Sequence, residues 1–225
     1  MSAARNPSEK IKVFVVDDHA VLRRGLAQLI EADGGMVLCG EAAAAPEALE
    51  KMEKALPDVA VVDISLRDSS GIELIKDIKI RWPETAVLVL SMHDESFYAE
   101  RVLRAGAMGY VTKGEASEKV IEGIRRILRG EVYVSDKVAA KMIGKFVKGA
   151  PGSKDFSMDA LSDRELEVFE LLGEGLATRQ IAQRLHLSVK TIDTHRENIK
   201  RKLNIANASE LLQRAIQWVR YERGG

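Results

Sequence analysis

The sequence predicts an α/β domain built on a five-stranded parallel sheet, followed by a linker and a small all-α domain of four helices. Three observations support this prediction. Short runs of Val, Ile and Leu alternate with segments of helical period over the first 130 residues. These runs are apolar on both faces, which is typical of a parallel sheet covered by helices on each side. After residue 161 no further strand pattern occurs, and only helical patterns remain.

The composition limits the classes of protein to consider. The 225 residues are enough for two ordinary domains, each with its own core. Charged residues make up 30% and apolar residues 46% of the chain, which excludes the disordered and membrane classes. The N-terminal segment lacks the apolar stretch of a signal peptide. We therefore expect a cytoplasmic protein with no membrane partner.

The elements of the first domain follow from its apolar runs. We expect strands at 11–16, 36–41, 59–64, 86–91 and 108–112, separated by helices, with a fifth helix at about 117–128. A helix-like segment at 135–147 and a segment containing Gly, Pro and Ser at 148–157 indicate a linker. The expected divisions are a flexible N-terminus at 1–9, a sheet domain at 10–132, a linker helix and flexible linker at 133–158, and a helical domain at 159–225.

The second domain separates into four helical patterns, at about 162–173, 177–184, 189–202 and 207–221. Ser162 is followed three residues later by Glu165, which is the spacing of a capping box. Ser188 is an expected N-cap for the third helix of this domain.

Acidic residues follow two strands of the predicted sheet. Asp17 and Asp18 end the first strand, and Asp63 ends the third. Ligands of such sheets bind at the carboxyl ends of the strands, and three carboxylates gathered there need a compensating cation. Oxygen ligands select a hard ion, so Mg²⁺ is the expected metal. With the cation bound, a carboxylate oxygen of Asp63 is positioned to attack a phosphoryl donor.

Two further strand ends complete this candidate site. Lys113 follows the fifth strand and is expected to stabilise charge on the phosphoryl oxygens. Ser91 ends the fourth strand and is expected to donate a hydrogen bond to the phosphoryl group, moving the loop that carries it. Phosphorylation would then act as a conformational signal.

Taken together, residues 11 to about 130 resemble a response-regulator receiver domain, with VVDDH, VVDIS, LVLSMHD and GYVTK in the expected order. The resemblance implies a flavodoxin-like sheet and Mg²⁺ bound by Asp18, Asp63 and the backbone carbonyl of Ser65, with Asp17 acting through water. It also implies a sensor histidine kinase as the partner that phosphorylates Asp63.

The resemblance assigns a switch to the same domain. It implies that Lys113 pairs with the phosphoryl group and that Tyr110 is the aromatic partner of Ser91. Two positions depart from the family pattern, because Arg67 and Gly114 stand where prolines are common. Arg67 loses the fixed φ of proline in the loop after the third strand.

Positive charge gathers in the second domain. Seven basic and two acidic residues lie between Leu176 and Lys202, although the whole chain has a net charge of zero. We expect Val189, Ile192, Ile199 and Leu203 to form the apolar stripe that docks the third helix on the core.

The stretch from Leu161 to Leu212 is similar to the helix-turn-helix of LuxR-type regulators. The side chains that lie off the stripe can then enter a major groove of double-stranded DNA. We expect backbone phosphate contacts from Thr178, Arg179, Lys190, Arg196, Lys200 and Arg201, and base contacts from Thr194 with Asp193 and Glu197. Thr191 also lies off the stripe and can enter the groove.

The last helix carries more apolar residues than one face of a small domain needs, which makes it the candidate dimer surface. These residues are Leu211, Leu212, Ala215, Ile216 and Val219. A homodimer predicts DNA with two half-sites related by a two-fold axis.

Together these features predict a response regulator of the NarL/FixJ class whose phosphorylation controls dimerisation and promoter binding, and which is not an enzyme acting on other substrates. Three alternatives stay open: a constitutive DNA-binding dimer with a receiver that does not switch, a helical bundle that binds protein, and a phosphoaspartyl hydrolase. The hydrolase is disfavoured because Ser65 stands where the dehalogenase-like enzymes carry a second aspartate.

Overall fold

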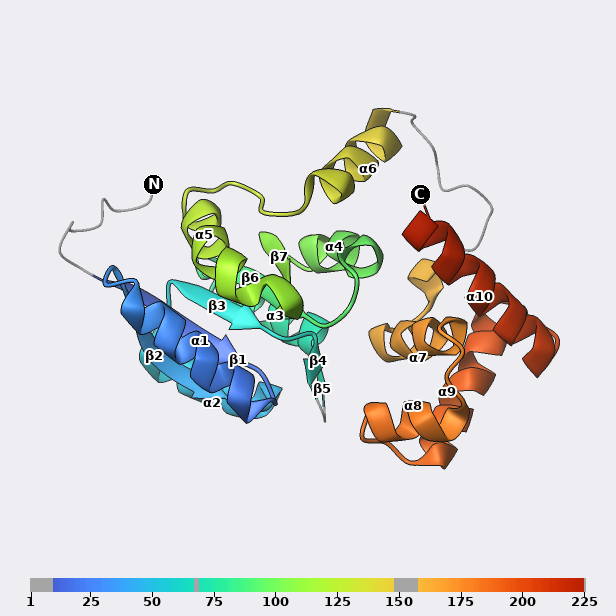
Figure 1. Cartoon of the computed structure of the whole chain (residues 1–225). Helices are drawn as coiled ribbons and strands as arrows, with labels where there is room; N and C mark the ends of the chain where they lie inside the picture. Colours follow the sequence, from blue (N-terminus) through green and yellow to red (C-terminus); the bar gives the residue numbers. More distant parts are fainter. Residues whose placement is uncertain (1–9, 67–68, 148–157, 225) are drawn as a thin grey trace. The chain divides into compact units, whose positions relative to one another are not determined.

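The computed structural model describes residues 10–66, 69–147 and 158–224, and its contacts divide the chain into two compact units, Met1–Ala140 and Lys141–Gly225 (Figure 1). The expected flexible N-terminus, the segment at 148–157 and Arg67 lie outside the described residues.

The first unit is built on the predicted parallel sheet. Its strands are β1 (Ile11–Val16), β2 (Met36–Ala42), β3 (Val59–Val62), β6 (Ala86–Ser91) and β7 (Gly109–Thr112). Their order is β2-β1-β3-β6-β7, and every pair is parallel. Because β1 and β3 lie side by side, with Val16 paired to Val62, the residues that follow them meet at one edge of the sheet. The expected five-stranded α/β fold is confirmed.

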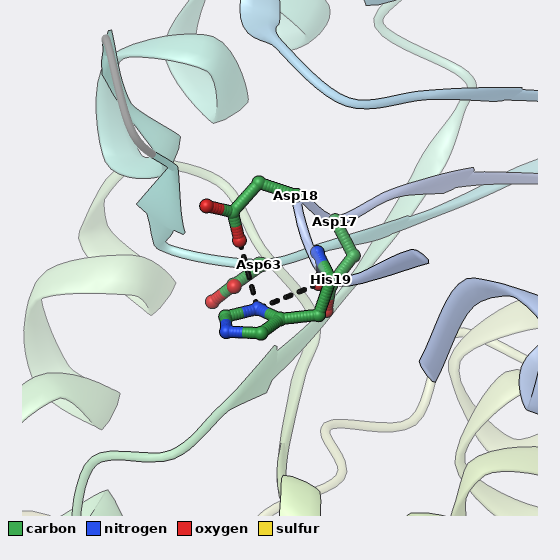
Figure 2. Close-up of side chains that lie close together, drawn as sticks. All are labelled: Asp17, Asp18, His19 and Asp63. Carbon is green, nitrogen blue, oxygen red and sulfur yellow. Dashed lines mark hydrogen bonds and ion pairs between the residues drawn. The ribbon is translucent and has the colours of Figure 1, made fainter. Parts of the chain in front are cut away.

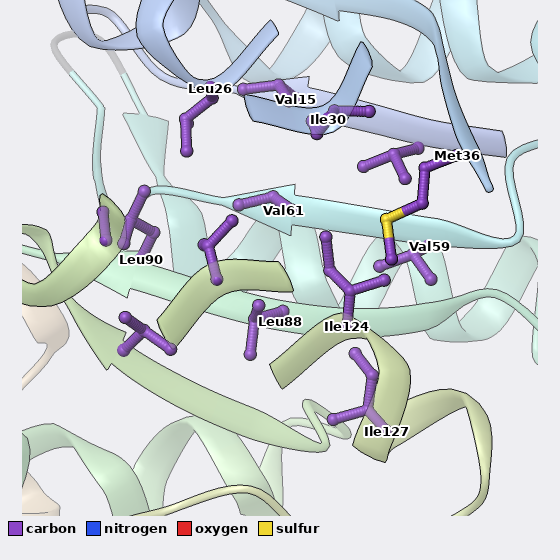
Figure 3. Packing of buried hydrophobic residues seen from close by; sticks show 14 of the residues in the cluster. Val15, Leu26, Ile30, Met36, Val59, Val61, Leu88, Leu90, Ile124 and Ile127 are labelled. Carbon is purple, nitrogen blue, oxygen red and sulfur yellow. The ribbon is translucent and has the colours of Figure 1, made fainter. Parts of the chain in front are cut away.

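Helices cover both faces of this sheet. The helices are α1 (Ala20–Ala32), α2 (Ala45–Ala55), α3 (Gly71–Arg81), α4 (Glu95–Arg104) and α5 (Ala116–Leu128). One face packs against α1 and α5, where Leu26, Ile30 and Ile124 meet Val61 and Leu88 in a fully buried cluster (Figure 3). The helices α2, α3 and α4 lie on the opposite face (Figure 1).

Two small features of the first unit were not predicted. A short antiparallel hairpin, β4 (Ser65–Leu66) with β5 (Ser69–Ser70), lies between β3 and α3. Beyond α5, Tyr133 forms a parallel bridge with Gly109 at the edge of β7, before α6 (Asp136–Val147) begins. The chain therefore stays attached to the sheet at the start of the expected linker.

The second unit contains the four predicted helices, α7 (Asp163–Gly173), α8 (Thr178–Arg184), α9 (Val189–Lys202) and α10 (Ala208–Gly224), preceded by a short 3₁₀ helix at Met158–Ala160. The capping box of Ser162 and Glu165 is present at the start of α7. Gly173 allows α7 to approach α10, because a Cβ there would collide with the carbonyl oxygen of Ala215.

Within the described part of the chain, no helix combines the length and the apolar character that crossing a membrane requires.

Candidate functional site

The predicted acidic cluster forms at the carboxyl edge of the sheet. Asp17 and Asp18 follow β1, and Asp63 follows β3. Asp17 and Asp63 are each only 1% exposed. One ligand atom from each of these acids and one from His19 all lie within 4.8 Å of one another (Figure 2). Sheet register therefore brings together carboxylates that are 46 residues apart in the chain.

Gly71 makes room for this arrangement at the start of α3. Its N–H donates to the carbonyl of Ile64 at 3.1 Å, which folds the chain back after the hairpin. A Cβ at position 71 would collide with the backbone carbonyl of Asp63. Only glycine permits the approach of α3 to this backbone without a shift.

Lys113 lies between two of the acids. It begins a 3₁₀ helix (Lys113–Glu115) directly after β7, and its Nζ lies 2.7 Å from Oδ2 of Asp17 and 2.5 Å from Oδ2 of Asp63. Burial works against the charge of the Lys113 ammonium, but Asp63 and Asp17 outweigh burial, so the pKa of Lys113 lies above its ordinary value. The lysine is held in its charged form at the site.

The electrostatic balance of the cluster remains negative. Burial raises the pKa of the Asp63 carboxyl and outweighs the attraction of Lys113, and the neighbouring Asp17 raises it further. When Asp17, Asp18 and Asp63 are all ionised, Lys113 compensates one of three negative charges. The carboxylate donor set and the two remaining charges fit a hard divalent cation.

His19 belongs to the same cluster, although the sequence analysis did not single it out. Its backbone N–H donates to Oδ1 of Asp17 at 2.7 Å, and its Nδ1 lies 2.8 Å from Oδ1 of Asp18 (Figure 2). The side chain of His19 is 59% exposed, so it covers the acids from the solvent side. Its position directly after two aspartates was the available signal.

Arg23 fixes the turn that carries the first two acids. Its Nη1 donates to the backbone carbonyl of Asp17 at 2.6 Å. Because this bond runs from α1 to the end of β1, it holds the acidic turn against the first helix.

Ser65 hydrogen-bonds to Asp63, the residue expected to be phosphorylated. Its backbone N–H donates to Oδ1 of Asp63 at 3.0 Å. Its Oγ lies 2.8 Å from Nε2 of His93, which connects the loop after β3 with the loop after β6.

The two expected switch residues meet at His93. Ser91 is fully buried, and its Oγ accepts a hydrogen bond from the N–H of His93 at 3.1 Å. Tyr110 is 2% exposed, and its hydroxyl donates to the carbonyl of His93 at 3.0 Å. The two side chains that the resemblance pairs as a switch therefore both bond to the backbone of His93.

The second unit presents a helix-turn-helix. The turn after α8 passes through His186, which has a φ of 53°. Ile192 and Ile199 of α9 are fully buried and dock this helix on the core as expected. Val189 is 42% exposed, so its predicted place in the stripe is wrong. It is the first residue of α9 and lies beyond the edge of the core, whereas Leu203 is half-buried.

The expected DNA contacts divide by exposure. Arg179, Lys190, Asp193, Thr194, Glu197 and Arg201 are exposed, whereas Thr178, Thr191, Arg196 and Lys200 are half-buried. Nη1 of Arg196 donates to Oγ1 of Thr178 at 2.5 Å, which ties the start of α8 to α9. Lys200 pairs with Glu197 at 2.9 Å.

The apolar residues of α10 do not all form a free surface. Leu211, Ala215 and Val219 are buried within the domain, so they are not available to a partner as the sequence analysis expected. Leu212 is 42% exposed and Ile216 is half-buried. Both line a pocket of about 490 Å³.

Comparisons with known proteins match each of the two units to a family. Residues 13–125 match the family described as "Response regulator receiver domain", and residues 159–215 match "Bacterial regulatory proteins, luxR family". The oxygen regulatory protein NreC of Staphylococcus carnosus (strain TM300) is 33% identical over 92% of this chain and 97% of that protein.

Solved structures share the fold of this chain. RcsB from Salmonella enterica serovar Typhimurium, bound to promoter rprA in the presence of phosphomimetic BeF3-, is 26% identical with a TM-score of 0.58, covering 92% of this chain and 98% of that one. A LuxR-family two-component response regulator from Aurantimonas sp. SI85-9A1 is 32% identical with a TM-score of 0.57, covering 62% of this chain and 99% of that one.

Proposed function

The chain belongs to the response regulators that join a receiver domain to a LuxR-type DNA-binding domain, and on this premise we propose that phosphorylation of Asp63 by a sensor histidine kinase controls its binding to promoters. The observation that carries the proposal is the buried contact of Lys113 with both Asp17 and Asp63 at the carboxyl edge of the sheet.

The transfer step uses one carboxylate oxygen of Asp63 as the nucleophile. A new P–O bond forms, the bond between phosphorus and the kinase histidine breaks, and its electron pair leaves with the imidazole. The product is an acyl phosphate. The Lys113 ammonium lies 2.5 Å from Oδ2 of Asp63, so it is close enough to pair with the phosphoryl oxygens and stabilise their negative charge.

The acidic cluster is the proposed Mg²⁺ site. Asp18, Asp63 and the backbone carbonyl of Ser65 would hold the ion, with Asp17 acting through water. A bound Mg²⁺ would neutralise charge on the phosphoryl oxygens as they approach the carboxylates. The support for this assignment is the oxygen donor set and the excess of negative charge described above.

The proposed switch starts at Ser91. In the structure the Oγ of Ser91 accepts a hydrogen bond from the His93 N–H. When the Ser91 hydroxyl rotates to donate to the phosphoryl group, this bond to His93 changes. His93 also binds Ser65 and Tyr110, so the loop after β6 is connected to both. A change at Ser91 therefore reaches the start of α4.

The DNA-binding unit acts, in this proposal, as one half of a homodimer. The exposed basic residues on α9 and Arg179 on α8 set affinity through phosphates, while Thr194, Asp193 and Glu197 read bases. Two recognition helices of a dimer would lie about 34 Å apart on two-fold related half-sites. Leu212 and Ile216 are the candidate interface residues.

The test compares affinity for a DNA duplex, selected from a random pool, with and without acetyl phosphate and Mg²⁺. We expect tighter binding after phosphorylation, and no change for Asp63→Asn. If the unchanged protein and Asp63→Asn bind the duplex with equal affinity, each with and without acetyl phosphate and Mg²⁺, the protein is a constitutive DNA binder. Sustained release of phosphate from phosphomonoesters, abolished by Asp63→Asn, would instead indicate a hydrolase.

A further inference from the structure

The linker helix α6 begins with an incomplete cap of its own. Oγ of Ser135 accepts from the N–H of Val138 at 3.3 Å, and the carbonyl of Ser135 accepts from the N–H of Ala139 at 2.9 Å. These bonds place Ser135 at the N-cap. In a capping box, an acidic side chain three residues later returns to the N–H of the N-cap residue, but that position is Val138 here.

A residue of another helix completes this cap. Oε1 of Glu95, the first residue of α4, accepts from the N–H of Ser135 at 2.8 Å. In α7 the equivalent bond comes from within the helix, because Oε2 of Glu165 accepts from the N–H of Ser162 at 2.7 Å. The first turn of α6 therefore depends on the position of α4.

A second attachment lies just before this cap. The N–H of Tyr133 donates to the carbonyl of Met108 at 2.9 Å, and the N–H of Tyr110 donates to the carbonyl of Tyr133 at 2.8 Å. The Tyr133 ring fits over Gly123, where a Cβ would be tight against it. A Cβ on Gly109 would be tight against the carbonyl oxygen and the Cβ of Tyr133. These bonds hold the chain that leads to α6 along the edge of β7.

Both attachments begin at elements that carry the proposed switch. Tyr110 bonds to the carbonyl of His93 through its hydroxyl and to Tyr133 through its backbone. Glu95 lies two residues after His93, whose N–H donates to Ser91. Glu95, which completes the cap of the linker helix, therefore lies only four positions after Ser91, the expected phosphoryl contact.

We propose that Glu95 is a positioning residue that couples the phosphorylation site to the linker helix α6. The Glu95–Ser135 bond closes the first turn of α6 in the unphosphorylated protein. When Ser91 turns to the phosphoryl group, the loop that leads into α4 moves, Glu95 leaves Ser135, and the first turn of α6 opens. This inference rests on the proposed phosphorylation of Asp63.

Hydrogen exchange of the full chain tests the coupling. Amides of residues 136–140 are followed with and without acetyl phosphate and Mg²⁺, while intact mass reports phosphorylation. In the unchanged protein we expect their exchange to rise at least threefold on phosphorylation. In Glu95→Ala it should be fast in both states, whereas Glu95→Gln keeps the acceptor and should behave like the unchanged protein. Glu100→Ala is the matched control, because Glu100 lies on the same helix and pairs with Arg104.

A second readout separates coupling from a merely structural cap. The ratio of DNA affinities with and without phosphorylation should fall at least threefold in Glu95→Ala, with the extent of phosphorylation unchanged. The coupling would be overturned if the affinity ratio in Glu95→Ala equalled that of the unchanged protein. It would also be overturned if hydrogen exchange at 136–140 in the unchanged protein did not change on phosphorylation. Absence of a phosphoryl mass shift in the unchanged protein would overturn the proposed function and the coupling with it.

Discussion

Replacement of Asp63 by asparagine should make the first unit more stable when no divalent cation is present. Asp63 and Asp17 are each 1% exposed, and Asp18 lies beside them. Lys113 pairs with Asp17 and Asp63 but carries a single positive charge. Asparagine keeps the shape of the side chain and removes one of the three like charges.

The expected size of this effect follows from the geometry. Two unit charges 4.8 Å apart, the upper limit within the cluster, repel by about 3.5 kcal/mol at an effective dielectric constant of about 20. The substitution also gives up the attraction between Asp63 and Lys113. Because the pKa of Asp63 is raised by burial and by Asp17 despite that attraction, the unfavourable contributions dominate. We expect the free energy of unfolding to rise by about 1–2 kcal/mol, which is less than the repulsion of one pair because the attraction to Lys113 is lost as well.

Urea unfolding of the full chain in EDTA measures this change. The chain has two tryptophans, so a Trp218→Phe background leaves Trp82 to report on the first unit alone. Mg²⁺ at ten times its Kd should stabilise the unchanged protein by about 1.4 kcal/mol and Asp63→Asn by much less. The matched control is Asp77→Asn, an exposed acid on α3, which should have little effect. Asp63→Asn that is no more stable than the unchanged protein would refute the claim that repulsion dominates the site.

Three further outcomes test the second unit. The pKa of Glu165 lies below its ordinary value, because Lys202 at 2.6 Å and the Ser162 N–H outweigh burial. The ionised Glu165 therefore stabilises the fold fully above its unfolded-state pKa, and this stabilisation is lost as the pH falls through the lower folded-state pKa. In Glu165→Gln the free energy of unfolding should decrease less steeply below about pH 5. A pH profile identical to that of the unchanged protein would contradict this. Lys190→Ala should reduce the slope of log affinity against log salt by about 1 on any duplex, whereas an effect confined to one sequence would make Lys190 a base contact. Leu212→Glu should reduce dimerisation on DNA in sedimentation experiments, and a persistent dimer would place the interface elsewhere.

The regular parts of the fold were predictable because they follow repeating patterns. All five strands of the sheet appear at the expected segments, and α9 has the bounds that its sequence indicated. Asp17, Asp18 and Asp63 come together because strand ends of a parallel sheet share one edge, which the order of apolar runs already implies.

The unpredicted features depend on contacts that no local pattern encodes. The hairpin strands β4 and β5 are two residues each, too short for a period. The exposure of Val189 depends on where the core ends, and the burial of Leu211, Ala215 and Val219 depends on the approach of α10 to α7. The bond between Glu95 and Ser135 joins residues 40 positions apart, and neither has a neighbour that would indicate the other.

The strength of the link through Glu95 limits the response that it can produce alone. Loss of one helix cap costs about 1 kcal/mol, which corresponds to about a fivefold change in an equilibrium. Shifting a population from 1:99 to 99:1 requires about 5.5 kcal/mol. The Glu95–Ser135 bond can therefore support a graded response of the linker helix. A sharp response would require a second contribution, and pairing of two chains on two half-sites is the one that this architecture offers, because a dimer adds the contacts of a second recognition helix.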